Sequence, residues 1–359
     1  MNYATRQSRL QERIQRQGLD AVLVTHLPNI RYLCGFTGSS GVLAASTGQV
    51  ALFTDGRYAE QAGQEVQGAR TVITRASALQ AAGRWLAARR NAGRLAVEAD
   101  HLTLLGQSVL KAALPSRSLL RPLTGIVERL RMIKEPQEVE RIRAAAKLAG
   151  SLFRPLLSRI RPGRLEVEVA ADLEFAARRR GGEGMSFETI VASGARSALP
   201  HGKASSQPIP NAGFLILDFG VILAGYCSDM TRTLYLGRVS RGARRMYEAV
   251  RQAQAEAVAA VRPGIPVGGV DRAARRVLAK AGLAGYFTHS TGHGVGLEIH
   301  EPPRLARGEK ELLVPGMVVT VEPGVYVPRR GGVRIEDMVL VTEQGCEVLT
   351  HAPRELIEL

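Results

Sequence analysis

Hydrophobic positions in the first third of the chain alternate between helical and strand-like spacing. Leu10, Ile14 and Leu19 recur at helical intervals, whereas 21–25 and 50–54 are short, mainly apolar runs of the kind found in buried strands. The predicted helices cover 5–18, 57–67, 77–91 and 102–113, and the predicted strands cover 21–25, 41–45, 50–54, 71–74, 95–98 and 117–121. Such alternation predicts an α/β domain.

The pattern changes near residue 125. Pro122 follows the last predicted strand, and Pro136 fits the first turn of a long helix. We therefore expect two domains, 1–125 and 126–359. The second should contain helices over 136–160, 165–180, 240–262 and 268–282, strands over 188–193, 213–218 and 230–236, and mostly strands and glycine-rich turns from Thr288 onward.

The composition indicates a globular protein. The chain has 359 residues, 45% of them hydrophobic, which is enough to bury a substantial core. Apolar runs stay well below the roughly 20 residues that span a bilayer, so we expect no membrane anchor. The charged N-terminus does not suit a signal peptide, and Cys34, Cys227 and Cys346 lie far apart, which argues against a disulfide framework. We expect a cytoplasmic location.

A formal charge of +15 raises the question of nucleic-acid binding. Lys111, Lys134, Lys147, Lys203, Lys280 and Lys310 are the only lysines, so the excess is nearly all arginine. Clusters such as 178–180 and 244–245 are scattered through helical stretches and are not gathered into a tail. Solvated helix faces explain them more simply than a nucleic-acid surface does.

Two aspartates lie at the ends of neighbouring predicted strands. Asp218 ends the apolar run 214–217, and Asp229 begins the next strand after a turn that contains Gly225. A hairpin of this kind would bring the two carboxylates side by side, where they repel unless a proton or cation lies between them. Each aspartate alone could also be a turn or cap residue.

Two glutamates have similar surroundings. Glu322 ends the run 318–321 and precedes a Pro-Gly turn, and Glu336 lies within the apolar run 333–340, which we expect to be one strand. A carboxylate there would be costly to bury unpaired. Each could be a surface residue, but together with Asp218 and Asp229 they favour a shared cation site.

His293 lies between two glycines, which allow close backbone approach in an irregular strand. His201, His289 and His300 belong to the same half of the chain. A lone histidine is more often structural, but four histidines beside four candidate carboxylates favour a functional site.

Carboxylates with one imidazole suit hard or borderline cations, with Mn²⁺ preferred and Co²⁺, Zn²⁺ or Fe²⁺ as alternatives. Four carboxylates can neutralise two divalent ions. Two such ions would lower the pKa of a water between them and polarise the bond to be cleaved. The residues thus predict metal-assisted hydrolysis.

The ligand order in Asp218, Asp229, His293, Glu322 and Glu336 resembles that of the pita-bread metallopeptidases, which include prolidase, aminopeptidase P, methionine aminopeptidase and creatinase. The resemblance runs from about 126 to the C-terminus and implies an α+β pita-bread catalytic domain. The first domain resembles the α/β creatinase-like N-terminal domain of prolidases and aminopeptidases P. Methionine aminopeptidase lacks that domain and creatinase lacks the ligands, so both are disfavoured.

The resemblance implies roles for the five ligands. Asp218 and Asp229 would share one ion, His293 would bind the other, and Glu322 and Glu336 would hold or bridge both. Glu322 would also carry a proton from the attacking water to the leaving nitrogen.

The resemblance also implies roles for residues around the metals. His300 would stabilise the tetrahedral intermediate, and His201 and His289 would bind the substrate, so all three are predicted catalytic histidines. Tyr326 and Arg334 would support the metal ligands from behind.

The implied substrate is a peptide with proline at its second position. Arg304 resembles the arginine with which prolidases hold the carboxylate of a dipeptide, although a surface arginine explains it about as well. We therefore expect an Xaa-Pro dipeptidase, with an Xaa-Pro aminopeptidase acting on longer peptides as the alternative. Relatives commonly form homodimers. A non-catalytic binding protein of the same fold and a hydrolase of small non-peptide amides remain further alternatives.

Overall fold

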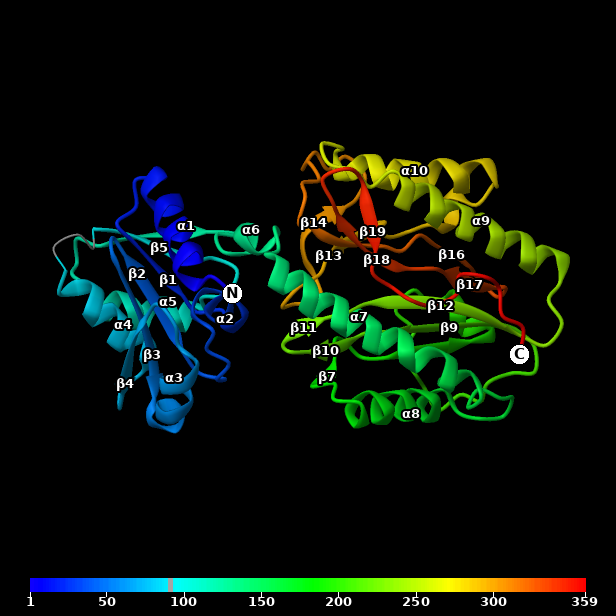
Figure 1. The fold of residues 1–359 in the computed structure, drawn as a ribbon, viewed down its shortest axis with the longest axis horizontal. Helices are drawn as coiled ribbons and strands as arrows, with labels where there is room; N and C mark the ends of the chain where they lie inside the picture. The colour runs from blue at the N-terminus through cyan, green and yellow to red at the C-terminus, as the bar shows by residue number, and fades with distance from the viewer. Residues whose placement is uncertain (90–92) are drawn as a thin grey trace. The chain divides into compact units, whose positions relative to one another are not determined.

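The computed structural model describes residues 1–89 and 93–359, which divide into two compact units, Met1–Arg131 and Met132–Leu359 (Figure 1). Buried hydrophobic residues cluster within each unit. Throughout the described residues, every helix is too short or too polar to cross a membrane. Cys34, Cys227 and Cys346 form no disulfide bond within residues 1–89 and 93–359.

A mixed sheet forms the centre of the first unit. Its strands are β1 (Ala21–Val24), β2 (Val42–Ser46), β3 (Gln49–Asp55), β4 (Arg70–Thr74), β5 (Arg94–Glu98) and β6 (Leu119–Leu123). They lie in the order β4-β3-β2-β1-β5-β6, in which β2 is antiparallel to both neighbours and the other pairs are parallel. Parallel strands combined with helices confirm the predicted α/β class.

The helices of the first unit are α1 (Tyr3–Arg16), α2 (Leu27–Cys34), α3 (Ala59–Glu65), α4 (Ala78–Ala87), α5 (Leu104–Ala113) and α6 (Glu128–Arg131), with a 3₁₀ turn at Gly56–Tyr58. Helices α4 and α5 pack together, and Leu86 and Leu110 join Leu23 and Phe53 in one buried cluster. The predicted helix over 77–91 corresponds to α4, and its last two predicted residues lie outside the described residues.

The hydrophobic pattern does not predict helix α2. Pro28 lies in its first turn, and Gly35 ends it in the left-handed region at φ 87°. The side chain of Asn29 is fully buried and donates to Glu98 Oε1 at 2.7 Å, so a polar residue takes a core position. A short helix with a partly polar buried face gives little helical hydrophobic periodicity.

Two pairs of helices flank the strands of the second unit. These helices are α7 (Pro136–Leu157), α8 (Glu166–Arg179), α9 (Arg241–Ala259) and α10 (Val267–Lys280), with 3₁₀ turns at Gly194–Ala198 and Ala284–Tyr286. Figure 1 shows α9 and α10 on one side of the strands and α8 on the other. Helices α7 and α8 share one buried cluster with the strands, and α9 and α10 share another.

Antiparallel pairing joins the strands of the second unit, as expected for the predicted α+β class. They are β7 (Gly184–Met185), β8 (Ile190–Ser193), β9 (Gly213–Phe219), β10 (Val221–Leu223), β11 (Tyr226–Cys227), β12 (Met230–Leu236), β13 (Gly292–Gly294), β14 (Glu301–Leu305), β15 (Val318–Val321), β16 (Gly324–Val327), β17 (Gly331–Arg334), β18 (Asp337–Val341) and β19 (Cys346–Val348). They form the groups β11-β10-β7, β12-β9-β8, β14-β13-β15-β18-β19 and β16-β17.

Two strand boundaries differ from the prediction in ways that shape the pocket described below. Strands β9 and β12 pair with Asp218 opposite Thr231, but residues 220–228 between them form the hairpin β10–β11 instead of a simple turn. The run 333–340 is divided between β17 and β18, because Glu336 leaves the ladder and its N–H donates to Thr231 O at 3.1 Å. Both strand boundaries are determined by pairing between distant segments, which hydrophobic periodicity does not report.

Candidate metal centre

One pocket in the second unit collects nearly all the residues singled out from the sequence. Its volume is about 760 Å³. Its walls include His201, Asp218, Asp229, His289, His293, His300, Arg304, Glu322, Arg334 and Glu336. Tyr326 lies behind this wall, hydrogen-bonded to His289 and Arg334. Residues up to 135 positions apart in the sequence thus meet in one cavity.

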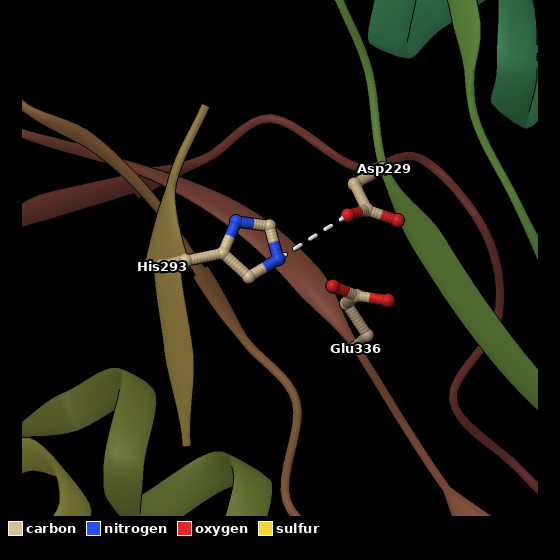
Figure 2. Close-up of side chains that lie close together, drawn as sticks. All are labelled: Asp229, His293 and Glu336. Atoms are coloured by element: carbon tan, nitrogen blue, oxygen red, sulfur yellow. Dashed lines mark ion pairs between the residues drawn. The ribbon is translucent and has the colours of Figure 1, made fainter. Parts of the chain in front are cut away.

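The centre of the pocket is a cluster of Asp229, His293 and Glu336. Figure 2 shows the three side chains pointing toward one another. Asp229 directly precedes β12, His293 belongs to β13, and Glu336 lies between β17 and β18. One potential ligand atom from each lies within 4.8 Å of the others. This spacing is suitable for a cation between them.

The tautomer of His293 follows from its hydrogen bond. Its Nδ1 lies 3.0 Å from Gly294 O, and a carbonyl can only accept, so Nδ1 carries the proton. Burial lowers the pKa of His293 to about 4, so the ring is neutral near pH 7. The Nε2 lone pair therefore faces Asp229 Oδ2 at 3.6 Å and Glu322 Oε1 at 3.5 Å. A lone pair opposed to two carboxylates is stabilised by a cation between them.

Buried carboxyl oxygens without partners support the same interpretation. Asp218 Oδ1, Asp229 Oδ1 and Glu336 Oε1 are buried and have no hydrogen-bond partner within the described part of the chain. Burial, reinforced by neighbouring carboxylates, raises the pKa values of Asp229 and Glu336 well above their usual range. Burial also raises the pKa of Glu322 to about 7. The donor set, oxygens with one imidazole, fits divalent cations of the Mn²⁺ type.

Arg334 holds the opposite side of the carboxylate group. Its side chain is buried, and it donates to Asp218 Oδ2 at 2.5 Å, to Tyr326 Oη at 2.6 Å and to Thr231 Oγ1 at 3.1 Å. One guanidinium cannot balance four carboxylates. The remaining negative charge is what bound cations would neutralise.

His289 and Tyr326 form a fixed pair. His289 Nδ1 lies 2.8 Å from Ser290 O, which makes Nδ1 the donor and leaves Nε2 to accept from Tyr326 Oη at 2.8 Å. Burial lowers the pKa of His289 to about 4 and raises that of Tyr326 to about 12, so both are neutral near pH 7. Both ring nitrogens of His289 are thus engaged within the protein.

His300, His201 and Arg304 have greater freedom. The rings of His300 and His293 meet edge-on with centroids 4.4 Å apart. Burial, followed by the nearby His201, lowers the pKa of His300. His201, His300 and Arg304 are exposed at the pocket wall, and Arg304 lies opposite His293 in the β13–β14 ladder. The predicted contact of these three side chains with a substrate is compatible with their exposure to the pocket.

Sequence reasoning missed two threonines that orient the carboxylates. Thr231 Oγ1 donates to Glu336 Oε2 at 2.7 Å, and Thr320 Oγ1 lies 3.5 Å from Glu322 Oε1. Both occupy buried strand positions beside a candidate ligand. Thr320 precedes Glu322 by two residues, so strand alternation could have identified it, whereas Thr231 meets Glu336 across 105 residues.

The raised carboxyl pKa values predict a pH-dependent loss of stability in the metal-free protein. Asp229, Glu322 and Glu336 bind protons more tightly in the folded than in the unfolded protein. Their contribution to the free energy of unfolding is therefore fully present below the ordinary carboxyl pKa of about 4. It is lost as the pH rises through the raised values, about 7 for Glu322. We expect the free energy of unfolding to fall by a few kcal/mol between about pH 5 and about pH 7.5. Urea denaturation of chelated protein measures this change.

The control for the pH effect is Glu336→Gln, which removes one of these carboxyl groups. The variant should show a shallower fall over the same pH range. An equally steep fall would show that other groups cause it.

Comparisons with known proteins agree with this geometry. The model of metallopeptidase family M24 matches residues 140–343, and the model of the creatinase/prolidase N-terminal domain matches residues 6–133. An Xaa-Pro dipeptidase of Pyrococcus horikoshii is 34% identical over 346 residues, which cover 96% of this chain and 97% of that protein.

Two solved structures share the complete architecture. An Xaa-Pro dipeptidase from Bacillus anthracis is 41% identical, with a TM-score of 0.97 and full coverage of both chains. An X-Pro aminopeptidase from Thermotoga maritima is 34% identical, with a TM-score of 0.89 over 98% of this chain and 99% of that one. The fold is therefore common to proteins with both names.

Proposed function

The chain belongs to metallopeptidase family M24 and carries a creatinase/prolidase N-terminal domain, and we propose that it is an Xaa-Pro dipeptidase that works with two divalent cations. The observation that carries the proposal is the pocket that joins a carboxylate–histidine cluster to the exposed Arg304. Relatives named Xaa-Pro dipeptidase, 41% and 34% identical along nearly the whole chain, support it.

The proposed division of work follows from the environment of each residue. Asp218, Asp229, His293, Glu322 and Glu336 would hold the ions, which would supply an activated water and polarise the carbonyl of the scissile bond. The carboxyl group of Glu322, whose Oε1 lies 3.5 Å from His293 Nε2 at the pocket wall, would carry a proton from the attacking water to the leaving nitrogen.

The residues at the pocket wall bind the substrate. His300, held near His293, stabilises the oxygen of the tetrahedral intermediate, and His201 contacts the peptide. His289 keeps a neutral edge at the pocket wall, where it shapes the substrate site. Arg304 binds the free α-carboxylate of the proline residue, which is the C-terminal residue of the dipeptide.

An Xaa-Pro bond requires a site of this kind. The bond is a tertiary amide, so its nitrogen has no hydrogen to donate to an enzyme. A site in which cations would polarise the carbonyl and Glu322 would protonate the leaving nitrogen does not need that hydrogen. This makes proline at the second position compatible with the geometry.

The proposal includes the cation, the cellular compartment and the oligomeric state. Mn²⁺ is the preferred ion because the donors are mainly carboxylates, and elemental analysis of purified protein tests it. Three cysteines without a disulfide bond in the described part of the chain fit a reducing, cytoplasmic compartment. A homodimer, proposed from the resemblance to prolidases, is tested by light scattering.

The decisive substrate test compares Ala-Pro with Ala-Pro-Ala in the presence of Mn²⁺. We expect kcat/KM to be at least about tenfold higher for Ala-Pro, because only the dipeptide places a carboxylate beside Arg304. Arg304→Gln should raise KM for Ala-Pro by about 10- to 100-fold, since it removes a hydrogen-bonded charge pair.

The matched control is Arg307→Gln, which changes an exposed arginine two residues after the end of β14. It should leave KM unchanged. Faster cleavage of Ala-Pro-Ala than of Ala-Pro would assign the protein to the X-Pro aminopeptidases instead.

A further inference from the structure

A buried ion pair lies beneath the wall of the pocket, between Lys134 and Glu301. Lys134 Nζ and Glu301 Oε2 are 3.1 Å apart, and the two side chains are 1% and 2% exposed. Burying two charges costs desolvation free energy that their attraction only partly offsets. Ion pairs retained at such a cost hold a particular backbone arrangement in place in some proteins.

The lysine end of the pair is fixed by its backbone. Lys134 N–H donates to Gly316 O at 2.9 Å, and Gly316 N–H donates to Val341 O at 3.0 Å. Lys134 thus projects from a segment tied to the end of β18. At 1% exposure its ammonium is out of reach of a substrate.

The glutamate end organises the loop that carries His300. Glu301 Oε1 accepts from Glu298 N–H at 3.1 Å, and Gly296 passes so close that a Cβ there would lie 2.6 Å from either carboxyl oxygen. Gly296 O in turn accepts from Cys227 N–H at 2.8 Å. The loop 296–301 is therefore folded around the Glu301 carboxylate.

Backbone pairing alone does not position this loop. Across β13 and β14, His293 lies opposite Arg304, but the next pair is Gly294 and Glu301, so the ladder shifts register between them. Arg304 is fixed by the regular part of the ladder. His300 and Glu301 lie beyond the irregularity, where the Lys134 ion pair supplies the anchor.

We infer that Lys134 is a positioning residue for the reaction. It acts through Glu301 to hold His300 beside the cluster of candidate metal ligands. The inference rests on the proposed function, because it assigns His300 to the substrate side of the pocket. Lys134 then affects the chemical step more than substrate binding, since Arg304 is held independently.

The first test is Lys134→Met, which keeps the length of the side chain and removes its charge. We expect kcat for Ala-Pro to fall by about 10- to 100-fold, because misplacement by about 1 Å of a catalytic group has this effect. KM should change by less than about threefold. Metal content should match the wild type. Lys147→Met, an exposed lysine on α7, is the matched control and should change none of these values.

A double-mutant cycle tests whether Lys134 acts through Glu301. Glu301→Gln alone should lower kcat as Lys134→Met does. In the Glu301→Gln background, Lys134→Met should then lower kcat by less than about threefold, because coupled residues are not additive. The double variant buries no unpaired charge, so it decides the question even if Lys134→Met does not fold.

Hydrogen exchange gives a readout that does not depend on activity. The amides of Gly296 and Glu298 should exchange about tenfold faster in Lys134→Met than in the wild type, with global stability measured in parallel. Wild-type kcat in folded, metal-loaded Lys134→Met would overturn the inference, as would an undiminished effect of the substitution in the Glu301→Gln background. Failure of the wild type to cleave Ala-Pro would instead overturn the proposed function, and exchange would still report on the loop.

Discussion

Removing divalent cations with EDTA is expected to lower kcat/KM for Ala-Pro by at least about 1000-fold, since cations of this kind supply several kcal/mol of transition-state stabilisation. Adding Mn²⁺ to the chelated protein should restore the activity. The physical reason is the charge of the pocket: Asp218, Asp229, Glu322 and Glu336 surround a neutral His293, and Arg334 is the guanidinium that opposes them.

The two ions should bind with different affinities. Asp229, His293 and Glu336 already present their ligand atoms within 4.8 Å of one another. Asp218 Oδ2 is held by Arg334 at 2.5 Å, so an ion on that side must share the carboxylate with a guanidinium. We therefore expect calorimetric titration with Mn²⁺ to resolve a tighter and a weaker step.

Circular dichroism of the chelated protein is the control, because loss of activity is informative only if the fold persists. The thermal midpoint should rise when Mn²⁺ is added, since an ion that binds only the folded state stabilises it. Full activity in protein with less than about a tenth of an equivalent of metal would contradict a metal-dependent mechanism.

The candidate ligands were predictable because each interrupts a strong local pattern. Asp218 follows the apolar run 214–217, Glu322 follows the apolar strand β15, and His293 lies between glycines that are themselves required. A Cβ on Gly292 would lie 1.9 Å from Thr320 O, and one on Gly294 would lie 2.3 Å from Pro302 O. These glycines mark close backbone approach, which the sequence displays directly.

The orientation of the ligands was not predictable in the same way. Thr231 and Arg334 position Glu336 and Asp218 through contacts across 105 and 116 residues. Hydrophobic periodicity reports which face of an element is buried but not which polar groups meet there. For the same reason, the pairing of Lys134 with Glu301, 167 residues away, could not be predicted from hydrophobic periodicity.

Helix α2 could not be predicted from hydrophobic periodicity either. Its buried Asn29 bonds to Glu98 and Glu128, so its core face is held partly by hydrogen bonds. Burial of polar groups with satisfied partners is stable in the folded protein but resembles a loop in the sequence. Prediction succeeded for the long, amphipathic helices α7, α9 and α10, in which apolar packing dominates.

Replacement of Glu322 by glutamine is expected to lower kcat by about 10²- to 10⁴-fold, the range typical of lost general acid–base catalysis. The Oε1 of this carboxyl lies 3.5 Å from His293 Nε2 at the pocket wall, among the proposed metal ligands. A carboxamide of the same size keeps an oxygen for a metal ion but cannot exchange a proton. The loss should therefore appear mainly in kcat.

The Glu322 experiment requires metal content to be measured together with rate, because the same residue is a proposed ligand. Glu343→Gln, an exposed glutamate beyond β18, is the matched control and should leave kcat and metal content unchanged. If Glu322→Gln keeps its metal and more than about a tenth of wild-type kcat, another group carries the proton. If metal is lost and kcat recovers fully at high Mn²⁺, Glu322 acts only as a ligand. A rate that stays low at saturating metal separates proton transfer from binding.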